Sequence, residues 1–352
     1  MTNNKPLPHH IPLLAILSLL PLLPSCSSRR TTTNTTTEPA NIYADSLAIM
    51  SYNVENLFDP DDNPLKNDDE FTPDGIYHWN EYRFRKKCAQ LGQVITLING
   101  KDLPDIIGLC EVEGPDTTGI SAATLLVRYA NLPLTPVCFP TPDNRGIATA
   151  LLFNPYTVEP LTLTHISASS DSLNLHTRDI LYAKLRTLRR KKTFHILVNH
   201  WPSKRGGTER STPLRQYVAQ RARQICDSIL ATDNNARIIL LGDFNDIAIE
   251  PSLTDFLGAQ PNCDTCRLRN LSADTPDFSY KYHGNWSTID HIIVSPAVCE
   301  NGRPHFSVYH PDFLLEPDDR NTGLKPKRTY IGRRYNEGGI SDHLPVLIKL
   351  PL

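Results

Sequence analysis

Short apolar runs recur along the whole chain, and they constrain the fold more than any other feature of the sequence. Each run is rich in Ile, Leu and Val and has the length of a strand with one or both faces buried. The runs cover Leu47–Tyr52, Asp105–Cys110, Ile147–Phe153, Val158–Ile166, Ile180–Leu188, Thr193–Asn199, Arg237–Gly242, Ile289–Val294 and Leu344–Leu350. One α/β domain with two sheets and outer helices would accommodate this many strands.

Helical periodicity is confined to fewer segments. Apolar residues at three-to-four spacing predict one helix through Phe84, Cys88, Leu91, Ile95 and Ile98, and another through Leu214, Val218, Ile225 and Ile229. A shorter helix is expected at residues 121–130. Neither an internal repeat nor a change in composition marks a further boundary, so we predict a single domain over residues 45–352.

Polar side chains stand where the predicted strands begin or end. They are Asn53, Glu55, Glu111, His200, Asp243, Asn245, Asp290, Asp342 and His343. Loops at strand ends converge over a rigid sheet, which is where functional groups tend to lie. We therefore expect these residues to form one site.

The residue types in this set favour phosphoryl chemistry assisted by a metal ion. Carboxylate and amide oxygens with no cysteine suit Mg²⁺, or Mn²⁺ as an alternative. Histidines beside carboxylates can take up or donate protons. The sequence has no Gly-x-x-x-x-Gly-Lys phosphate loop, no Gly-x-Ser-x-Gly elbow and no His-Glu-x-x-His zinc helix. Direct attack by activated water is therefore favoured over a covalent intermediate.

Motifs that contain these residues occur in a characteristic order. They are Met50–Asn56 (MSYNVEN), Ile107–Glu111 (IGLCE), Asn199–Trp201 (NHW), Leu241–Asn245 (LGDFN), Ile289–His291 (IDH) and Ser341–His343 (SDH). Each motif alone is weak, but the ordered set resembles the endonuclease/exonuclease/phosphatase superfamily, which includes deoxyribonucleases and sphingomyelinases. The resemblance spans nearly the whole chain after the N-terminal segment. It implies a two-sheet, four-layer α-β-β-α sandwich.

The resemblance also implies a role for each metal-site and histidine motif. Glu111 would be the main metal carboxylate, with Asn53 and Asp342 as further metal-site residues. His343 would be a general base or a phosphate-orienting imidazole, and Asp290 would hold it in the required tautomer.

The remaining motifs supply groups for water and phosphate. Asp243 would position the attacking water, and Asn245 would donate a hydrogen bond to a phosphate oxygen. His200 resembles the second histidine of pancreatic-type deoxyribonucleases and sphingomyelinases, which abasic-site nucleases lack. Arg178 is placed like the family's phosphate-contacting basic residue. His291 neighbours Asp290 on a predicted strand and should point to the opposite side, so we interpret it as structural.

The N-terminal segment has the features of an export signal. Residues 1–25 contain the apolar run Ile11–Leu23, which is too short for a comfortable membrane span. The run leads into Leu23-Pro24-Ser25-Cys26, which resembles the bacterial lipobox, in which the cysteine becomes lipidated. Residues 26–44 would then be the lipidated Cys26 and a flexible Thr-rich tether. This predicts a lipid-anchored protein of the bacterial cell envelope, periplasmic or surface-facing; a plain secretory signal is the alternative.

In the oxidising compartment that export implies, the cysteine count leaves at least one free thiol and does not define a disulfide framework. Removing the predicted lipidated residue from eight cysteines leaves seven, an odd number. Cys88, Cys110 and Cys226 lie in apolar patterns and should be buried thiols. Cys263 and Cys266 lie in a polar loop, where a structural disulfide is the first interpretation and half of a zinc site the second.

The charge balance narrows the substrate class without deciding it. With 36 Lys and Arg against 38 Asp and Glu, the chain is not a polycation that binds nucleic acid by bulk charge. Local basic clusters at residues 83–87, 184–192, 204–215 and 325–334 could contact DNA or RNA or could be solvated faces. The leading hypothesis is a phosphodiesterase with endonuclease-like activity. A phosphatase of a sugar, inositol or lipid-headgroup ester is the alternative, and an inactive lipid-anchored binding module is a remote one; no protein partner is implied.

Overall fold

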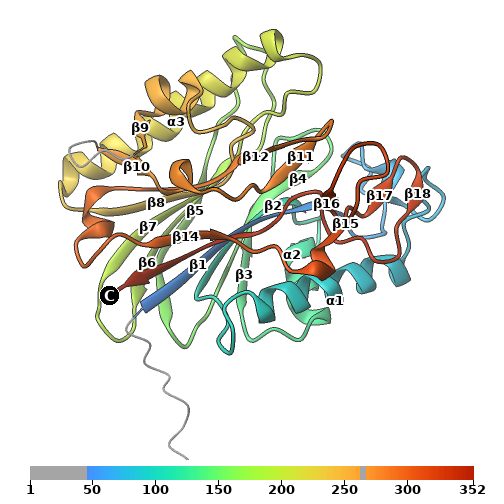
Figure 1. The fold of residues 1–352 in the computed structure, drawn as a ribbon, viewed down its shortest axis with the longest axis horizontal. Helices are drawn as coiled ribbons and strands as arrows, with labels where there is room; N and C mark the ends of the chain where they lie inside the picture. Colours follow the sequence, from blue (N-terminus) through green and yellow to red (C-terminus); the bar gives the residue numbers. More distant parts are fainter. Residues whose placement is uncertain (1–45, 262–266) are drawn as a thin grey trace, which may run out of the picture. The chain divides into compact units, whose positions relative to one another are not determined.

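Two mixed β-sheets pack face to face in the computed structural model, which describes residues 46–261 and 267–352 (Figure 1). The first sheet contains, in spatial order, β14 (His305–Val308), β19 (Val346–Pro351), β1 (Ser46–Leu57), β2 (Ile106–Glu113), β4 (Ile147–Phe153) and β3 (Thr135–Cys138). The second contains β5 (Val158–Ile166), β6 (Ile180–Thr187), β7 (Thr193–His200), β8 (Arg237–Asp243), β13 (Asp290–Val294), β10 (Leu268–Asn270) and β9 (Ala259–Gln260).

Helices cover the outer faces of the two sheets (Figure 1). The helices α1 (Glu81–Leu97) and α2 (Ala122–Tyr129) lie on the side of the first sheet, and α3 (Thr208–Thr232) lies on the side of the second. The predicted four-layer α-β-β-α sandwich is therefore confirmed. Among the described residues, no helix is both long enough and apolar enough to cross a membrane.

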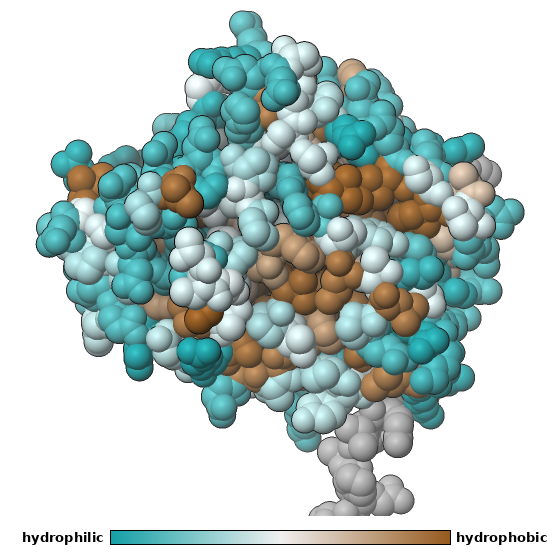
Figure 2. Space-filling view, turned by 180° about the vertical axis from the view of Figure 1, so that it is seen from behind, coloured by the Kyte–Doolittle hydropathy of each residue, from teal (hydrophilic) through white to brown (hydrophobic). Residues whose placement is uncertain are grey.

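The alternation of side chains along β8 explains why the second sheet is buried on both faces. Ile239 and Leu241 belong to the apolar cluster between the sheets, whereas Ile238 and Leu240 belong to the cluster beneath α3. Because neighbouring strand residues point to opposite faces, a continuous apolar run is what such a strand requires. Seen from behind, the surface shows several apolar areas separated by polar residues (Figure 2).

Small hairpins add strands that the apolar runs do not predict. They are β11 (Tyr280–Tyr282) with β12 (Asn285–Ser287), β15 (Leu315–Pro317) with β16 (Leu324–Pro326), and β17 (Tyr330–Ile331) with β18 (Arg334–Tyr335). The predicted long strands and the three helices all form, with shifts of a few residues at their ends.

One expectation about strand ends needs correction. Asn53, Glu55 and Glu111 do not follow their strands but lie inside β1 and β2, which continue to Leu57 and Glu113. The strand register shifts at these points, and Glu55 and Glu111 have positive φ angles of 50° and 61°. A β-bulge turns side chains out of the regular alternation, which is how strand-interior residues come to face the site.

Several sequence predictions fall on residues whose structure is not described. They concern the signal peptide at residues 1–25, lipidation of Cys26, the tether to residue 44, and the pair Cys263 and Cys266. The predicted burial of Cys88, Cys110 and Cys226 is confirmed.

Candidate active site

Strand direction brings the predicted catalytic residues of the second sheet into one row. The strands β7 and β8 are parallel, and their last residues, His200 and Asp243, lie opposite each other. Asp243 also lies opposite Asp290, the first residue of the antiparallel β13. Three adjacent strands thus place a histidine and two carboxylates side by side at one edge of the sheet.

Residues of the first sheet meet this row across the gap between the sheets. Asn53 Nδ2 donates a hydrogen bond to Asp243 Oδ2 at 3.0 Å. His343, which lies just before β19, places its Nδ1 at 2.8 Å from Asp290 Oδ2. Asn53, Asp243, Asp290 and His343 are each at most 5 % exposed, so these contacts are made away from bulk water.

Glu111 and Asn53 form the candidate metal centre. Glu111 Oε1 is 3.4 Å from Asn53 Nδ2, and its Oε2 accepts a hydrogen bond from the backbone N–H of Asn56 at 2.9 Å. No group of three or more His, Cys, Asp or Glu residues within the described ranges is arranged to hold a metal. The carboxylate of Glu111 fits Mg²⁺, which binds through few protein carboxylates and keeps waters or substrate oxygens. Asn53 turns its Nδ2 toward Glu111 and Asp243, and its Oδ1 accepts a hydrogen bond from the backbone N–H of Glu55 at 3.0 Å, so the metal role of Asn53 stays a prediction.

Asp342, predicted as a further metal residue, makes an ion pair. Its Oδ2 accepts a hydrogen bond from Arg328 Nη2 at 2.9 Å, and Arg328 Nε is 3.2 Å from Glu55 Oε1. The metal role of Asp342 stays a prediction. In this structure its described contact is with a cation that would compete with a metal ion for its charge.

A buried charge network behind the site was not predicted from the sequence. Lys87, only 1 % exposed, donates to the carbonyl of Glu55 and to Thr329 Oγ1, and Glu55 Oε2 accepts from the backbone N–H of Thr329. Burial raises the pKa of Glu55 to about 7 and lowers the pKa of Lys87 to about 8. The network ties the segment that contains Arg328 and Thr329 to α1 and β1.

The surroundings of His343 favour the protonated form of its imidazole. Burial lowers the pKa of its imidazole, but the carboxylates of Asp290, Asp243 and Asp342 outweigh burial and raise the pKa well above its ordinary value. Asp290 Oδ2 also accepts a hydrogen bond from Ser279 Oγ at 2.6 Å. This arrangement favours the phosphate-orienting role of His343 over the general-base role.

Asp243 lies between the two histidines. Its Oδ2 is 3.8 Å from His200 Nε2 and 3.9 Å from His343 Nε2, and its Oδ1 accepts from the backbone N–H of Asn245 at 2.9 Å. Burial raises the pKa of Asp243 to about 7, with the charge of His343 opposing the shift. A carboxylate with this pKa can accept a proton from water near neutral pH.

The surroundings of His200 favour the neutral form of its imidazole. Burial, Arg178, Arg145 and His343 lower the pKa of the His200 imidazole well below its ordinary value. Its Nδ1 is buried and has no hydrogen-bond partner among the described residues. The surroundings thus shift the pKa values of the two histidines in opposite directions.

The two predicted phosphate-binding residues share one backbone acceptor. Arg178 Nη2 and Asn245 Nδ2 both donate to the carbonyl of Trp201, at 2.8 Å and 3.0 Å. Arg178 Nη1 is also 3.4 Å from Asp143 Oδ2. Arg145, which sequence reasoning missed, donates at 3.4 Å to Oδ1 of Asn56, the residue whose backbone N–H donates to Glu111. The structure brings these groups together, and their phosphate role stays a prediction.

Two residues of the basic cluster at residues 204–215 make internal ion pairs. Arg215 is 1 % exposed and its Nε donates to Asp246 Oδ2 at 2.7 Å, while Lys204 Nζ is 3.1 Å from Asp246 Oδ1. Arg215 therefore cannot contact a substrate at the surface. His291 is 2.9 Å from the carbonyl of Asp246 and 2.8 Å from Ser272 Oγ, in agreement with a structural role.

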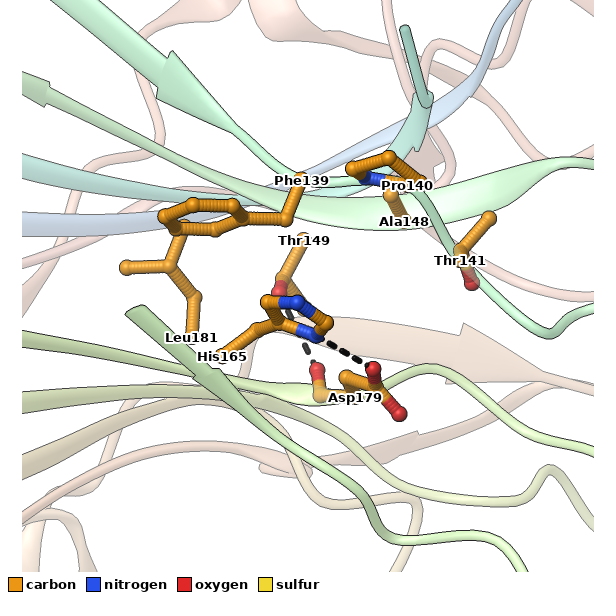
Figure 3. Close-up of a pocket in the computed structure, with 8 residues that line it drawn as sticks. All are labelled: Phe139, Pro140, Thr141, Ala148, Thr149, His165, Asp179 and Leu181. Atoms are coloured by element: carbon orange, nitrogen blue, oxygen red, sulfur yellow. Dashed lines mark hydrogen bonds and ion pairs between the residues drawn. The ribbon is translucent and has the colours of Figure 1, made fainter. Parts of the chain in front are cut away.

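A small pocket lies at the edge of the sandwich, apart from these residues. His165 Nδ1 is 2.7 Å from Asp179 Oδ2, and the ring of Phe139 stacks on His165 with centroids 5.0 Å apart (Figure 3). Leu181 and Thr149 complete its wall. Asp179 directly follows Arg178 in the chain, but none of the predicted catalytic or metal residues lines this pocket.

Comparisons with known proteins agree with this architecture. The model of the endonuclease/exonuclease/phosphatase family matches residues 48–351. A search of curated proteins finds no match.

Solved structures with the same fold are distant in sequence. An endonuclease/exonuclease/phosphatase family protein from Bacteroides thetaiotaomicron is 16% identical, with a TM-score of 0.55, over 87% of this chain and 94% of that chain. A mannosyl-6-phosphatase from the same organism is 15% identical, with a TM-score of 0.54, over 87% and 100%. The catalytic domain of human Nocturnin, with bound sulfate, is 20% identical, with a TM-score of 0.52, over 87% and 94%.

Proposed function

This chain belongs to the endonuclease/exonuclease/phosphatase family of phosphoester hydrolases, which generally use divalent metals, and we propose that it is a Mg²⁺-dependent phosphodiesterase with endonuclease-like activity. Mn²⁺ is the alternative metal. The observation that carries the proposal is the row of His200, Asp243 and Asp290, with His343 bonded to Asp290, next to the carboxylate of Glu111 and the side-chain amide of Asn53.

The chain's own residues divide the chemistry between them. Asp243 orients the attacking water and accepts its proton, because its pKa of about 7 suits that exchange. The imidazolium of His343, held by Asp290, stabilises negative charge on the phosphate oxygens.

Other residues act on the leaving group and on the position of the phosphate. Neutral His200 hydrogen-bonds the departing oxygen, and Arg178 and Asn245 orient the phosphate. A divalent ion held by Glu111 and Asn53, when bound, would neutralise charge on the phosphate and the leaving group.

Three substrates assayed side by side test the proposal. The purified protein is given an aryl phosphodiester, an aryl phosphomonoester and supercoiled plasmid, first with Mg²⁺ and then with EDTA. Metal-dependent diester hydrolysis with plasmid nicking is expected. Glu111→Gln should abolish it, whereas Glu209→Gln, at an exposed carboxylate in the first turn of α3, should not. Activity that is unchanged in Glu111→Gln would contradict the metal assignment.

A phosphatase of a small or lipid phosphoester is the second candidate. It is favoured by the near-zero net charge of −2 and by the ion pairs that occupy Lys204 and Arg215. The similar structures include a mannosyl-6-phosphatase. Monoester preference with intact plasmid would establish this candidate. Absence of hydrolysis with every substrate would instead favour the remote alternative, a binding module that has lost catalysis.

The proposed setting is the bacterial cell envelope, with Cys26 as the lipid anchor and DNA, RNA or another phosphoester as substrate. Metabolic labelling with a radioactive fatty acid tests this proposal. Label should be incorporated into the wild-type protein and lost in Cys26→Ala, which should also move the protein from the membrane fraction to the soluble fraction. A labelled Cys26→Ala protein would refute the anchor.

A further inference from the structure

A row of rings leads from the candidate catalytic imidazole to the surface. The ring of Tyr280 lies 4.6 Å from the ring of His343, centroid to centroid, and Tyr282 lies 6.4 Å from Tyr280 at an interplanar angle of 11°. Exposure increases along the row: His343 is 5 % exposed, Tyr280 is half-buried and Tyr282 is 61 % exposed. His283 packs edge-on against Tyr282 at 4.1 Å.

The hairpin that carries these rings is anchored by its opposite face. Tyr280 and Tyr282 are two residues apart in β11 and share one face, whereas Lys281 points the other way. Lys281 Nζ is 3.0 Å from Asp318 Oδ2 and lies 5.7 Å from the centre of the Trp286 ring. Trp286 in turn packs against the core between the sheets. Because Lys281 and Trp286 fix one face of the hairpin, the opposite face with the two tyrosine rings is held rigid and can bind a ligand.

Nothing bulky on the partner strand covers the two tyrosine rings. The residues opposite Tyr280 and Tyr282 in β12 are Ser287 and Asn285, both small. Aromatic residues that stabilise a hairpin usually pack on a large cross-strand neighbour, as Trp286 does on Lys281 on the other face. A purely structural role therefore does not explain why Tyr282 stands exposed in line with His343.

We propose that Tyr280 and Tyr282 form a stacking subsite for a nucleobase, carried by the group that stays on the scissile phosphate and not by the leaving group. The inference rests on the proposed phosphodiesterase function and narrows its substrate to nucleotide esters. Aromatic side chains bind nucleobases through their flat faces with little preference for sequence. The row starts at His343, so a ring stacked on it belongs to the same ester whose phosphate His343 orients.

Two phosphodiesters that share the same leaving group distinguish an effect on base stacking from an effect on the hydrolysis step. Both thymidine 5′-(p-nitrophenyl phosphate) and methyl p-nitrophenyl phosphate release p-nitrophenolate, and only the first carries a base. In Tyr282→Ala, KM for the thymidine ester should rise about tenfold, as expected for the loss of one stacking contact, while both constants for the methyl ester stay unchanged. Tyr282→Phe keeps the ring and should behave like the wild type.

A control variant and a binding measurement complete the design. Tyr156→Ala removes a tyrosine that is 72 % exposed and lies outside the row, and it should change neither KM. Equal effects of Tyr282→Ala on both esters, or none on either, would overturn the subsite while leaving the phosphodiesterase intact. If neither ester is hydrolysed, the proposed function fails, and calorimetry with thymidine monophosphate decides on the subsite. Binding that weakens about tenfold in Tyr282→Ala supports it, and absence of binding to the wild type overturns it.

Discussion

Replacing Asp290 by asparagine tests how the candidate site fixes the position and the charge of the His343 imidazole. Asp290 is 1 % exposed, and its Oδ2 accepts from Ser279 Oγ at 2.6 Å and lies 2.8 Å from His343 Nδ1. Asparagine has the same size but no charge. The variant therefore removes the partner of the imidazolium without opening a cavity, and its effect reports on positioning of His343 and not on packing.

The expected fall in kcat/KM of Asp290→Asn follows from the lost hydrogen bond between Asp290 and His343. A buried hydrogen bond to a charged group contributes about 1.5–3 kcal/mol, and each ~1.4 kcal/mol corresponds to a tenfold change in rate. The bond alone thus corresponds to a fall of about 10- to 150-fold in kcat/KM. Without Asp290, burial would also lower the pKa of His343 and weaken its positive charge. We expect a total loss of about 10²- to 10³-fold.

Stability should change little in the same variant. Asp290 raises the pKa of the neighbouring Asp243, which means that the two buried carboxylates repel each other. Asparagine removes this repulsion while it loses the bond to His343, so we expect the free energy of unfolding to change by less than about 2 kcal/mol. Steady-state kinetics and thermal unfolding on one preparation measure both quantities.

Two further variants control the measurement. Ser279→Ala removes the other hydrogen bond to Asp290 Oδ2 but keeps the charge, so it should cost less than about tenfold in rate. In the background of His343→Ala, Asp290→Asn should have little additional effect, because both act through one imidazole. A kcat/KM within threefold of wild type, or a fall in Tm large enough to unfold the protein in the assay, would refute the reasoning.

Three other predictions follow from single contacts. Mg²⁺ should raise the Tm of the wild type and not of Glu111→Gln, which calorimetry measures; equal shifts would place the ion elsewhere. Arg178→Ala should raise KM for phosphodiesters at least tenfold with a smaller effect on kcat, and the reverse pattern in steady-state kinetics would argue against a binding role. Gly242→Ala should cost about 3 kcal/mol in denaturant unfolding, because a Cβ there would collide with the carbonyl of Asn199 at a φ of 138°; an undiminished midpoint would contradict this.

The parts of the molecule that were predictable are those with local signals. A polar residue that directly follows an apolar run marks a strand end, so His200 and Asp243 could be assigned to one edge of a sheet. The four-layer sandwich was predicted from the family resemblance that the ordered motifs carry. The bulge at Glu111 was not predictable, because a positive φ in a non-glycine residue leaves no regular pattern in the sequence.

Contacts between distant segments were also beyond sequence reasoning. Arg328 and Glu55 are separated by 273 residues, and Lys87 and Thr329 by 242. In the sequence Lys87 and Arg328 belong to basic clusters that could equally contact substrate or solvent. Only the fold shows that Lys87 is buried and that Arg328 forms an ion pair. The sequence gives the sign of each charge but not the residue that it contacts.

The hydrogen bonds of the site also join the two sheets to each other. Asn53 lies in β1 of the first sheet, and His343 lies just before β19 of the same sheet. Their partners Asp243 and Asp290 lie in β8 and β13 of the second sheet. A small slip of one sheet over the other would therefore separate Asn53 and His343 from Asp243 and Asp290 before any strand lost its hydrogen bonds. Inactivation by mild denaturant should accordingly precede loss of secondary structure, which makes turnover a sensor of how the two halves of the sandwich are aligned.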